Sequence, residues 1–267
     1  MPITRPLSLV TGASAGIGAA FAHALAERGH DLVLVARRAE RLHALAAVLR
    51  ESRGIDVTVL PCDLALREAP QRLCMELAER GLAVDWLVNN AGYGVPGSFV
   101  GNDWRTHEDF LQVLLVAPTE LAWRLLPGMR ERGYGRIVNV ASLAGFVPGT
   151  AGHTLYAAAK AYMIKFSQSL ALENRAAGVN VCALCPGFTR SEFHDVTGTR
   201  AIMNRLPAFM WLDAAEVARQ GIAAVEQGRI VYVPGRVNRL IKALAEALPD
   251  RLALWLGSRQ ARRYRRG

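Results

Sequence analysis

A glycine-rich turn near the N-terminus constrains the fold of this chain more than any other feature. The apolar run Leu7–Val10 leads directly into the turn, in which Gly12, Gly16 and Gly18 follow one another closely. Beyond the turn, apolar residues recur three and four positions apart as far as Leu25, which is the spacing of one buried helix face. The sequence therefore predicts a buried strand that turns sharply into a helix.

The same alternation of apolar runs and helix-periodic stretches continues along the chain. We expect strands at residues 7–10, 31–36, 56–60, 84–88, 136–141, 179–185 and 230–233. We expect helices at about 38–53, 66–80, 104–131 and 214–226, and one that carries Tyr156 and Lys160 and runs to about residue 177. Continuous apolar strands separated by helices indicate a parallel sheet that is covered on both faces. The predicted fold class is α/β, a Rossmann-like doubly wound sheet of seven parallel strands flanked by helices on both faces.

The C-terminal segment has a different composition. We expect one domain over residues 1–235, followed at 236–267 by an amphipathic helix that is broken near Pro249 and ends in a basic tail. Five arginines between residues 259 and 266 account for much of the net charge of +9, since 9 − 5 leaves +4. The basic charge is therefore not a nucleic-acid-binding face. The helix is expected to pack on the protein's own surface or on a dimer partner, with weak membrane-surface contact as the alternative.

Composition bounds the class of protein. Hydrophobic residues make up 51% of the 267 residues, which excludes a disordered chain. The glycine-rich turn begins too early to leave room for a signal peptide, and no apolar run approaches the roughly 18 residues of a membrane span. We expect a cytoplasmic protein.

Two cysteines form a Cys-x-x-Cys motif, Cys182 and Cys185, inside the sixth predicted strand. Strand residues three apart point to opposite faces, so the two thiols cannot share a metal ion or form a redox pair. We therefore expect buried structural cysteines. His153 and His194 have no clustered partners, and no metal site is predicted.

Ser142, Tyr156 and Lys160 carry the parts of a proton-transfer site. Tyr156 and Lys160 are four residues apart in a predicted helix and so share one face. A phenol has a pKa of about 10 and needs a neighbouring cation to stabilise its phenolate at neutral pH. Lys160 can be that cation, and Ser142, which follows an apolar strand, can orient a carbonyl or alcohol oxygen.

The other motifs fall at predicted strand ends. Glycines at residues 12, 16 and 18 let the main chain approach a pyrophosphate, whose charge is favoured by a helix N-terminus. By itself such a turn can also be a purely structural corner. Asn89-Asn-Ala-Gly92, Ser142, Tyr156-x-x-x-Lys160 and Pro186-Gly187 follow in order, at the edge where open α/β sheets bind ligands. Their combination favours a dinucleotide site.

These motifs resemble those of the short-chain dehydrogenase/reductase (SDR) family, in its short single-domain subtype, over about residues 6–235. The resemblance implies a nicotinamide dinucleotide and hydride exchange with a carbonyl or alcohol. It assigns general acid/base catalysis to Tyr156, the lowering of its pKa and contact with the nicotinamide ribose to Lys160, and the substrate oxygen to Ser142. The residues that it places against the cofactor are Gly12, Ser14, Ala15, Gly16, Ile17, Gly18, Asp63, Leu64, Asn89, Ala91, Gly92, Tyr156, Lys160, Pro186, Gly187 and Thr189.

One position departs from the family pattern. Many SDR members carry an asparagine in the helix before the fifth strand, where it is thought to anchor a water that links the lysine to solvent. The matching residue here is Leu114. Leucine offers no hydrogen-bonding group, so we expect a rerouted proton relay or slow turnover.

Charge at the end of the second strand predicts the choice of cofactor. An acidic residue there would hold a ribose 2′-hydroxyl, whereas arginines accommodate a 2′-phosphate. Ala36 is followed by Arg37 and Arg38, which favours NADP(H) over NAD(H). The alternative is that both arginines merely begin a solvated helix together with Glu40 and Arg41.

The substrate is expected to be a lipophilic ketone or alcohol, such as a steroid, an acyl derivative or an aromatic compound. This follows from an apolar set between residues 186 and 213 that would cover the pocket, namely Phe188, Phe193, Ile202, Met203, Leu206, Phe209, Met210 and Trp211. The family resemblance implies a homodimer or homotetramer. Two other readings remain open: a dinucleotide-binding sensor or scaffold without catalysis, whose basic tail binds a partner or lipid, and an epimerase or dehydratase of the related extended type.

Overall fold

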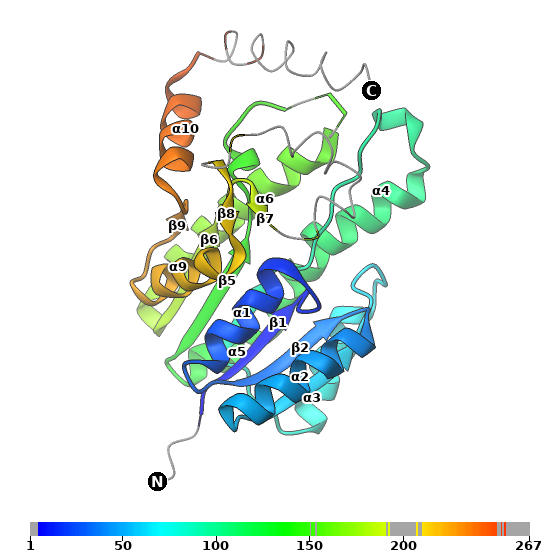
Figure 1. Cartoon of the computed structure of the whole chain (residues 1–267), viewed down its shortest axis with the longest axis vertical. Helices are drawn as coiled ribbons and strands as arrows, with labels where there is room; N and C mark the ends of the chain where they lie inside the picture. The colour runs from blue at the N-terminus through cyan, green and yellow to red at the C-terminus, as the bar shows by residue number, and fades with distance from the viewer. Residues whose placement is uncertain are drawn as a thin grey trace.

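The computed structural model describes residues 5–149, 151–152, 154–190, 192, 207, 210–249, 252 and 254. Within them lies one sheet of seven parallel strands in the order β3-β2-β1-β4-β5-β6-β9, which confirms the predicted fold class (Figure 1). Its strands are β1 (Leu7–Thr11), β2 (Asp31–Ala36), β3 (Val57–Pro61), β4 (Trp86–Asn89), β5 (Gly135–Val140), β6 (Val179–Leu184) and β9 (Val231–Tyr232). A separate pair of two-residue strands, β7 (Thr189–Arg190) and β8 (Leu212–Asp213), lies above the sheet.

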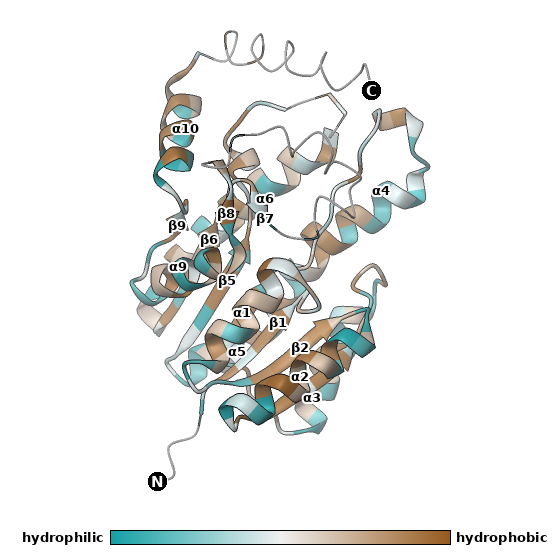
Figure 2. Cartoon of the chain, viewed as in Figure 1, coloured by the Kyte–Doolittle hydropathy of each residue, from teal (hydrophilic) through white to brown (hydrophobic). Residues whose placement is uncertain are grey.

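Helices cover both faces of the sheet. One face is packed by α1 (Gly16–Ala26), α2 (Ala39–Arg53) and α9 (Ala214–Glu226), and the other by α3 (Ala69–Glu79), α5 (Ala117–Glu131) and α6 (Thr154–Asn174). Alternate strand residues enter the two core layers: Val10 packs beneath α1, whereas Leu9 packs on the opposite side. Both are fully buried, and the strands form the hydrophobic centre of the molecule (Figure 2).

The Cys-x-x-Cys motif follows this alternation. Cys182 belongs to the core layer beneath α1 and α9, whereas Cys185 packs with Met163 and Ile164 of α6. Both cysteines are buried and free. The two thiols therefore lie in different core clusters, as the sequence predicts.

The helix predicted over residues 104–131 is interrupted. It consists of α4 (Trp104–Leu111), a π-helical turn at Gln112–Val116, and α5. Pro118 has no N–H to donate to the carbonyl of Leu114, and the Thr119 hydroxyl donates to the Leu115 carbonyl at 2.7 Å. Because these two residues remove or divert regular α-helical hydrogen bonds, the chain widens into a π turn there.

The predicted C-terminal helix is present as α10 (Arg236–Ala247), which ends two residues before Pro249. It lies beside the carboxyl ends of the strands (Figure 1). Asn238 anchors it: the side chain is buried, and its Nδ2 donates to the Pro234 carbonyl at 2.9 Å. Lys242 adds a second attachment, because its Nζ lies 5.0 Å from the centre of the Phe146 ring.

Candidate active site

A cavity of about 930 Å³ lies at the carboxyl ends of the strands. This is the edge at which open α/β sheets bind ligands, and the volume suits a dinucleotide with a small substrate. The predicted site residues that line it are Gly12, Ser14, Ala15, Gly16, Ile17, Arg37, Arg38, Asp63, Leu64, Ala91, Gly92, Ser142, Tyr156, Lys160, Pro186, Gly187 and Thr189. One cavity thus brings together motifs from seven separate parts of the sequence.

The glycine turn is fixed between two strands. Thr11 Oγ1 accepts hydrogen bonds from the main-chain N–H groups of Asn90 (2.9 Å) and Ala91 (3.1 Å), and donates to the Val88 carbonyl at 3.2 Å. Asn90 Nδ2 donates in return to the Thr11 and Gly12 carbonyls. Gly12 has a φ of +66°, and a Cβ there would lie 2.7 Å from Asn90 Nδ2. Only glycine satisfies both conditions, so the turn keeps its main chain open to the cavity.

Two of the predicted cofactor residues lie behind the cavity wall. A Cβ on Gly18 would lie 2.3 Å from the Gly12 carbonyl oxygen, so this glycine lets α1 pack against the turn. Asn89 is buried, and its Nδ2 donates to Asn139 Oδ1 (2.9 Å) and to the Pro118 carbonyl (3.2 Å). Asn90, which the sequence analysis did not single out, lines the cavity in its place. The adjacent pair of asparagines indicated this part of the site, but the sequence did not show which of the two lines the cavity.

Ser142, Tyr156 and Lys160 meet in one wall of the cavity. Ser142 follows β5 in an extended conformation, accepts a hydrogen bond from the Ala144 N–H at 3.1 Å, and shares a side-chain hydrogen bond with Tyr156. Lys160 lies one turn along α6, with its Nζ 5.7 Å from the centre of the Tyr156 ring. The ammonium donates to the Val140 carbonyl at 2.8 Å. A hydroxyl pair beside a buried cation is an arrangement for moving a proton to or from a substrate oxygen.

Burial shifts the pKa values of the two ionisable groups in opposite directions. Loss of solvent raises the pKa of Tyr156 to about 12, and the hydrogen bond with Ser142 offsets this only in part. Burial also lowers the pKa of Lys160 to about 8, against a smaller opposing effect of Cys185. Burial and the Ser142 hydrogen bond together set the pKa of Tyr156 in this structure, and Lys160 adds no resolved effect, so its lowering of the Tyr156 pKa stays a prediction.

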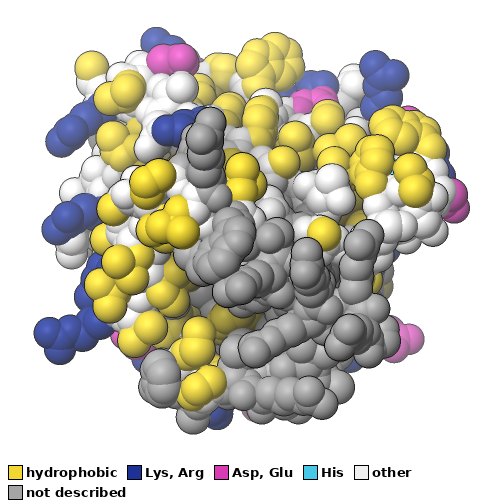
Figure 3. All heavy atoms as spheres, turned by 90° about the horizontal axis from the view of Figure 1, so that it is seen from above, with side chains coloured by type: hydrophobic (Ala, Val, Ile, Leu, Met, Phe, Trp, Pro, Cys, Tyr) yellow, Lys and Arg dark blue, Asp and Glu magenta, His cyan; other side chains and the backbone are white. Residues whose placement is uncertain are grey.

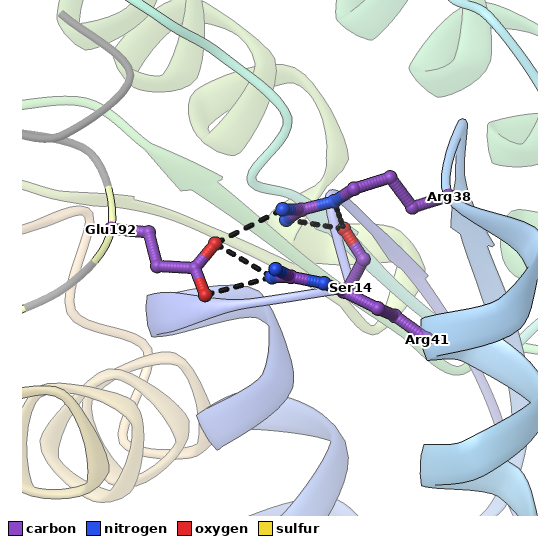
Figure 4. A network of polar contacts seen from close by, with 4 residues as sticks. All are labelled: Ser14, Arg38, Arg41 and Glu192. Carbon is purple, nitrogen blue, oxygen red and sulfur yellow. Dashed lines mark hydrogen bonds and ion pairs between the residues drawn. The ribbon is translucent and has the colours of Figure 1, made fainter.

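Arg37 and Arg38, at the start of α2, also line the cavity. Figure 4 shows Arg38 with its neighbours Ser14, Arg41 and Glu192. Arg38 donates from Nη2 (2.9 Å) and Nε (3.2 Å) to Ser14 Oγ, so it is tied to the glycine turn. Arg41, one turn further along α2, lies beside it, and both contact the carboxylate of Glu192. Arg37 lines the cavity and is exposed. The sequence named Arg41 only in the alternative of a solvated helix, and nothing in the sequence pattern singled out Glu192.

Helix α10 supplies an apolar side of the cavity through Ile241, Leu244, Ala245 and Leu248. Gly187 allows its close approach, because a Cβ there would lie 2.4 Å from Asn238 Oδ1. Seen from above, hydrophobic side chains gather at this end of the molecule (Figure 3). They include the exposed Leu240 and Leu244.

Comparison with known proteins decides the family. The sequence profile of the family described as "short chain dehydrogenase" matches residues 7–200. This protein belongs to the short-chain dehydrogenase family. The ketoacyl reductase HetN of Nostoc sp. is 34% identical, over 96% of this chain and 90% of that protein.

Solved structures agree with this assignment. A short-chain dehydrogenase from Sphingobium yanoikuyae in complex with NADPH is 34% identical with a TM-score of 0.80, over 92% of this chain and 96% of that one. The bulky-bulky ketone specific alcohol dehydrogenase from Comamonas testosteroni is 31% identical with a TM-score of 0.75, over 92% and 95% of the two chains. The chain is therefore an oxidoreductase of the SDR family, whose members use a nicotinamide cofactor and small-molecule substrates.

The residues of this SDR fit a nicotinamide dinucleotide. A Cβ on Gly12 would lie too close to Asn90 and Ala91, and a Cβ on Gly18 too close to the Gly12 carbonyl. Both glycines therefore keep the main chain of the turn tightly packed beside the cavity. Among the described residues, no side chain caps the N-terminus of α1 and no acidic residue lies in its first turn. Both features suit an anionic pyrophosphate.

Leu114 marks where this SDR departs from its family's pattern. It is 3% exposed and lies in the π turn, packed with Phe110, Val113 and Ala159. A small void of about 10 Å³ separates it from Lys160, and Asn89 also lines this void. That volume is close to the least that holds a single water, about 10 Å³. The position beside the lysine is therefore apolar on the Leu114 side and polar on the Asn89 side.

Some of the apolar residues that were expected to cover the substrate lie in the described part of the chain. Phe188 and Met210 line the cavity, and the Phe188 and Trp211 rings lie 5.9 Å apart. Other residues named from the sequence lie outside the described part of the chain: Phe193, Ile202, Met203, Leu206, Phe209, His153, His194 and the tail arginines. Within the part that is described, no helix is long and apolar enough to cross a membrane, and no three potential metal-ligating side chains gather.

Proposed function

We propose that this SDR is an NADP(H)-dependent oxidoreductase that transfers a hydride between nicotinamide and the carbonyl or secondary alcohol of a lipophilic substrate, with Tyr156 as general acid/base. The observation that carries the proposal is the grouping of Ser142, Tyr156 and Lys160 in one wall of a cavity that the glycine turn also lines. The cofactor supplies or accepts the hydride when it is bound. This chain's own residues orient the oxygen and handle the proton.

The proton chemistry follows from the hydroxyl pair. Ser142 can donate a hydrogen bond to a carbonyl oxygen and so hold it beside the Tyr156 hydroxyl, with which Ser142 already shares a hydrogen bond. With a pKa near 12, Tyr156 is protonated at neutral pH and is ready to donate its proton to an oxygen that gains negative charge. Lys160, still mostly protonated at pH 7, supplies positive charge next to that proton transfer. This protonation state favours carbonyl reduction.

The arginine end supports the preference for NADP(H). Arg38 and Arg41 point their guanidinium groups toward one position beside the glycine turn, and Ser14 adds a hydroxyl there (Figure 4). Guanidinium groups bind phosphate through charge-assisted hydrogen bonds. The second strand ends at Ala36 and is followed by Arg37, so the strand itself offers no carboxylate to a ribose 2′-hydroxyl. The related Sphingobium structure holds NADPH.

The apolar side of the cavity supports a lipophilic substrate. Leu143, Phe188 and Met210 lie on its margin together with the α10 residues Ile241 and Leu244. The names of the two other relatives, a ketoacyl reductase and a bulky-bulky ketone specific dehydrogenase, point to carbonyl compounds with large substituents. We propose a steroid-, acyl- or aromatic-ketone-like substrate.

Turnover of a ketone panel tests the function. Purified protein is mixed with NADPH or NADH and with steroid, acyl and aromatic ketones, and cofactor oxidation is followed by absorbance. Tyr156→Phe should abolish turnover and leave the dissociation constant for NADPH nearly unchanged. Tyr162→Phe is the matched control, because Tyr162 lies on the same helix, shares a hydrogen bond with Thr119 and is not among the described residues that line the cavity. Equal turnover by the Tyr156 variant would overturn the mechanism.

A second candidate is a dinucleotide-binding sensor without catalysis. The buried Leu114 favours it, since this side chain puts no polar group beside Lys160. The same assay separates the two functions. Tight NADPH binding without turnover of any ketone would support the sensor.

We further propose that the protein forms a homo-oligomer through α5 and α6. The outer surface of these helices exposes Trp123 (69%) and Leu172 (73%), together with Tyr162. Large exposed apolar side chains on neighbouring helices are typical of an interface. Sedimentation of the protein and of Trp123→Glu would test this proposal, because the variant should shift the distribution to a smaller species.

A further inference from the structure

Glu192 binds both arginines at the cofactor end of the cavity (Figure 4). Arg41 Nη1 lies 2.7 Å from each carboxylate oxygen, and Arg38 Nη1 lies 3.0 Å from Oε2. The glutamate comes from the segment after β7, whereas the arginines come from the start of α2, 154 and 151 residues earlier. The contact therefore joins two distant parts of the chain at the cavity, which Arg38 and Glu192 both line.

The carboxylate takes up hydrogen-bond donors that an NADP(H) phosphate needs. Arg38 has three of its donor atoms engaged, two on Ser14 and one on Glu192. Arg41 directs Nη1 at the same carboxylate. The Arg41 and Arg38 hydrogen bonds also keep the pKa of Glu192 below its ordinary value, so it is negatively charged at neutral pH. One anion thus already occupies the position between the guanidinium groups.

We propose that Glu192 competes with the cofactor's 2′-phosphate for Arg38 and Arg41. This competition weakens NADP(H) binding and reduces the preference for NADP(H) over NAD(H). This inference rests on the proposed function, because it assigns a second determinant to the same cofactor site. A phosphate that binds the two arginines must displace the carboxylate or lie against its charge. NAD(H) has a 2′-hydroxyl at this position, so its binding leaves the Glu192 contacts in place.

The expected effect is moderate because the ion pairs are exposed. The Arg38, Arg41 and Glu192 side chains are each 44–49% accessible, and solvent screens such pairs. Removing the carboxylate charge should therefore tighten NADPH binding by about three- to tenfold. NADH affinity should change by less than about twofold, since no phosphate meets the arginines.

The test is a binding titration of NADPH and NADH to wild type, Glu192→Gln and Glu226→Gln. Glutamine keeps the size of the side chain and removes its charge. Glu226 is the matched control, because it is also an exposed glutamate 2.7 Å from an arginine, Arg28, and does not line the cavity. Adenosine 2′,5′-bisphosphate serves as a third probe that carries the 2′-phosphate without nicotinamide. The inference requires that Glu192→Gln tighten binding of both phosphate-bearing probes selectively and that Glu226→Gln change neither.

A variant without the two arginines distinguishes competition for these donors from simple repulsion between Glu192 and the phosphate. In the variant Arg38→Gln/Arg41→Gln, the further change Glu192→Gln should no longer tighten NADPH binding, because the contested donors are gone. A gain that persists there undiminished would assign the effect to long-range repulsion and overturn the competition.

The failure of this inference can be told from that of the proposed function. Wild type that binds NADPH, with Glu192→Gln binding it equally well or more weakly, overturns the role of Glu192 alone. Wild type that binds neither dinucleotide overturns the proposed function, and this inference with it.

Discussion

Lys160 and Arg38 line one cavity, and Lys160 carries its positive charge in surroundings opposite to those of Arg38 and its neighbour Arg41. Lys160 is 7% exposed and is held by a main-chain carbonyl, whereas the arginine side chains are nearly half exposed and are paired with a carboxylate. Burial moves the pKa of the lysine toward neutrality. Exposure leaves the arginines open to exchange partners and to salt. These surroundings suit the two proposed roles, in which the buried lysine assists proton transfer and the exposed arginines bind a phosphate.

The largest effect is expected from removing the buried charge of Lys160. Lys160→Met keeps the length of the side chain and removes its charge, so kcat for ketone reduction should fall by about 10²- to 10⁴-fold. Thermal unfolding should show equal or greater stability, since an ammonium no longer has to be buried. Stopped-flow assays and calorimetry measure the two quantities. A loss of less than about tenfold would remove Lys160 from the proposed proton transfer.

The pH dependence tests the same part of the site without a mutation. In the proposed mechanism, alcohol oxidation needs Tyr156 as the phenolate. Because the pKa of Tyr156 is about 12, the phenolate fraction rises about tenfold for each pH unit at lower pH. The rate of oxidation should therefore increase by about a hundredfold between pH 6 and pH 8. Above its pKa near 8, Lys160 loses its charge, so the slope should flatten. Ketone reduction, which uses the protonated phenol, should stay nearly level from pH 6 to pH 7 and fall by about half at pH 8, where half of Lys160 is uncharged. An oxidation rate that falls between pH 6 and pH 8 would contradict this assignment.

The exposed arginines are tested by Arg38→Gln. Loss of charge-assisted hydrogen bonds to a phosphate should raise the KM for NADPH by about 10- to 100-fold. The KM for NADH and the kcat at saturating NADPH should change little, because neither depends on the 2′-phosphate. Arg80→Gln is the control, as this arginine pairs with Glu76 on α3 away from the cavity. Equal losses with both cofactors would show that Arg38 supports the turn and not a phosphate.

Leu114→Asn gives the smallest expected effect on rate. It places an amide beside the void that Lys160 lines, and kcat should rise about two- to fivefold where proton exchange limits turnover. The buried amide should cost about 1–3 kcal/mol of stability because its cluster is apolar. Leu114→Met is the control, and an unchanged kcat for the asparagine variant would mean that the leucine does not limit the proton relay.

Local motifs of the site could be predicted from sequence because their geometry comes from neighbouring residues. The glycine turn depends on main-chain conformation and close approach, and Tyr156 and Lys160 share a helix face by their spacing alone. Continuous apolar runs separated by helix-periodic stretches likewise predicted a parallel sheet covered on both faces. These are properties that a few consecutive residues determine.

Other features depend on contacts between distant segments and could not be predicted. The pairing of Glu192 with Arg41 joins residues 151 positions apart. The raised pKa of Tyr156 reflects how much protein surrounds it, which the sequence does not show. The π turn follows from Pro118 and Thr119 together, whereas the apolar periodicity favoured one continuous helix. The choice between Asn89 and Asn90 also needed the three-dimensional structure.

The close fit of Gly187 against Asn238 has a consequence for how specificity can diverge. The proposed catalytic residues follow β5 and lie on α6, whereas α10 contacts the rest of the chain through Asn238, against Gly187, and through Lys242, over the Phe146 ring. We therefore expect that residues 243–248 can be exchanged while α10 stays in place, provided that Asn238 and Lys242 are retained. Such an exchange would alter which molecules are admitted and leave the redox centre intact.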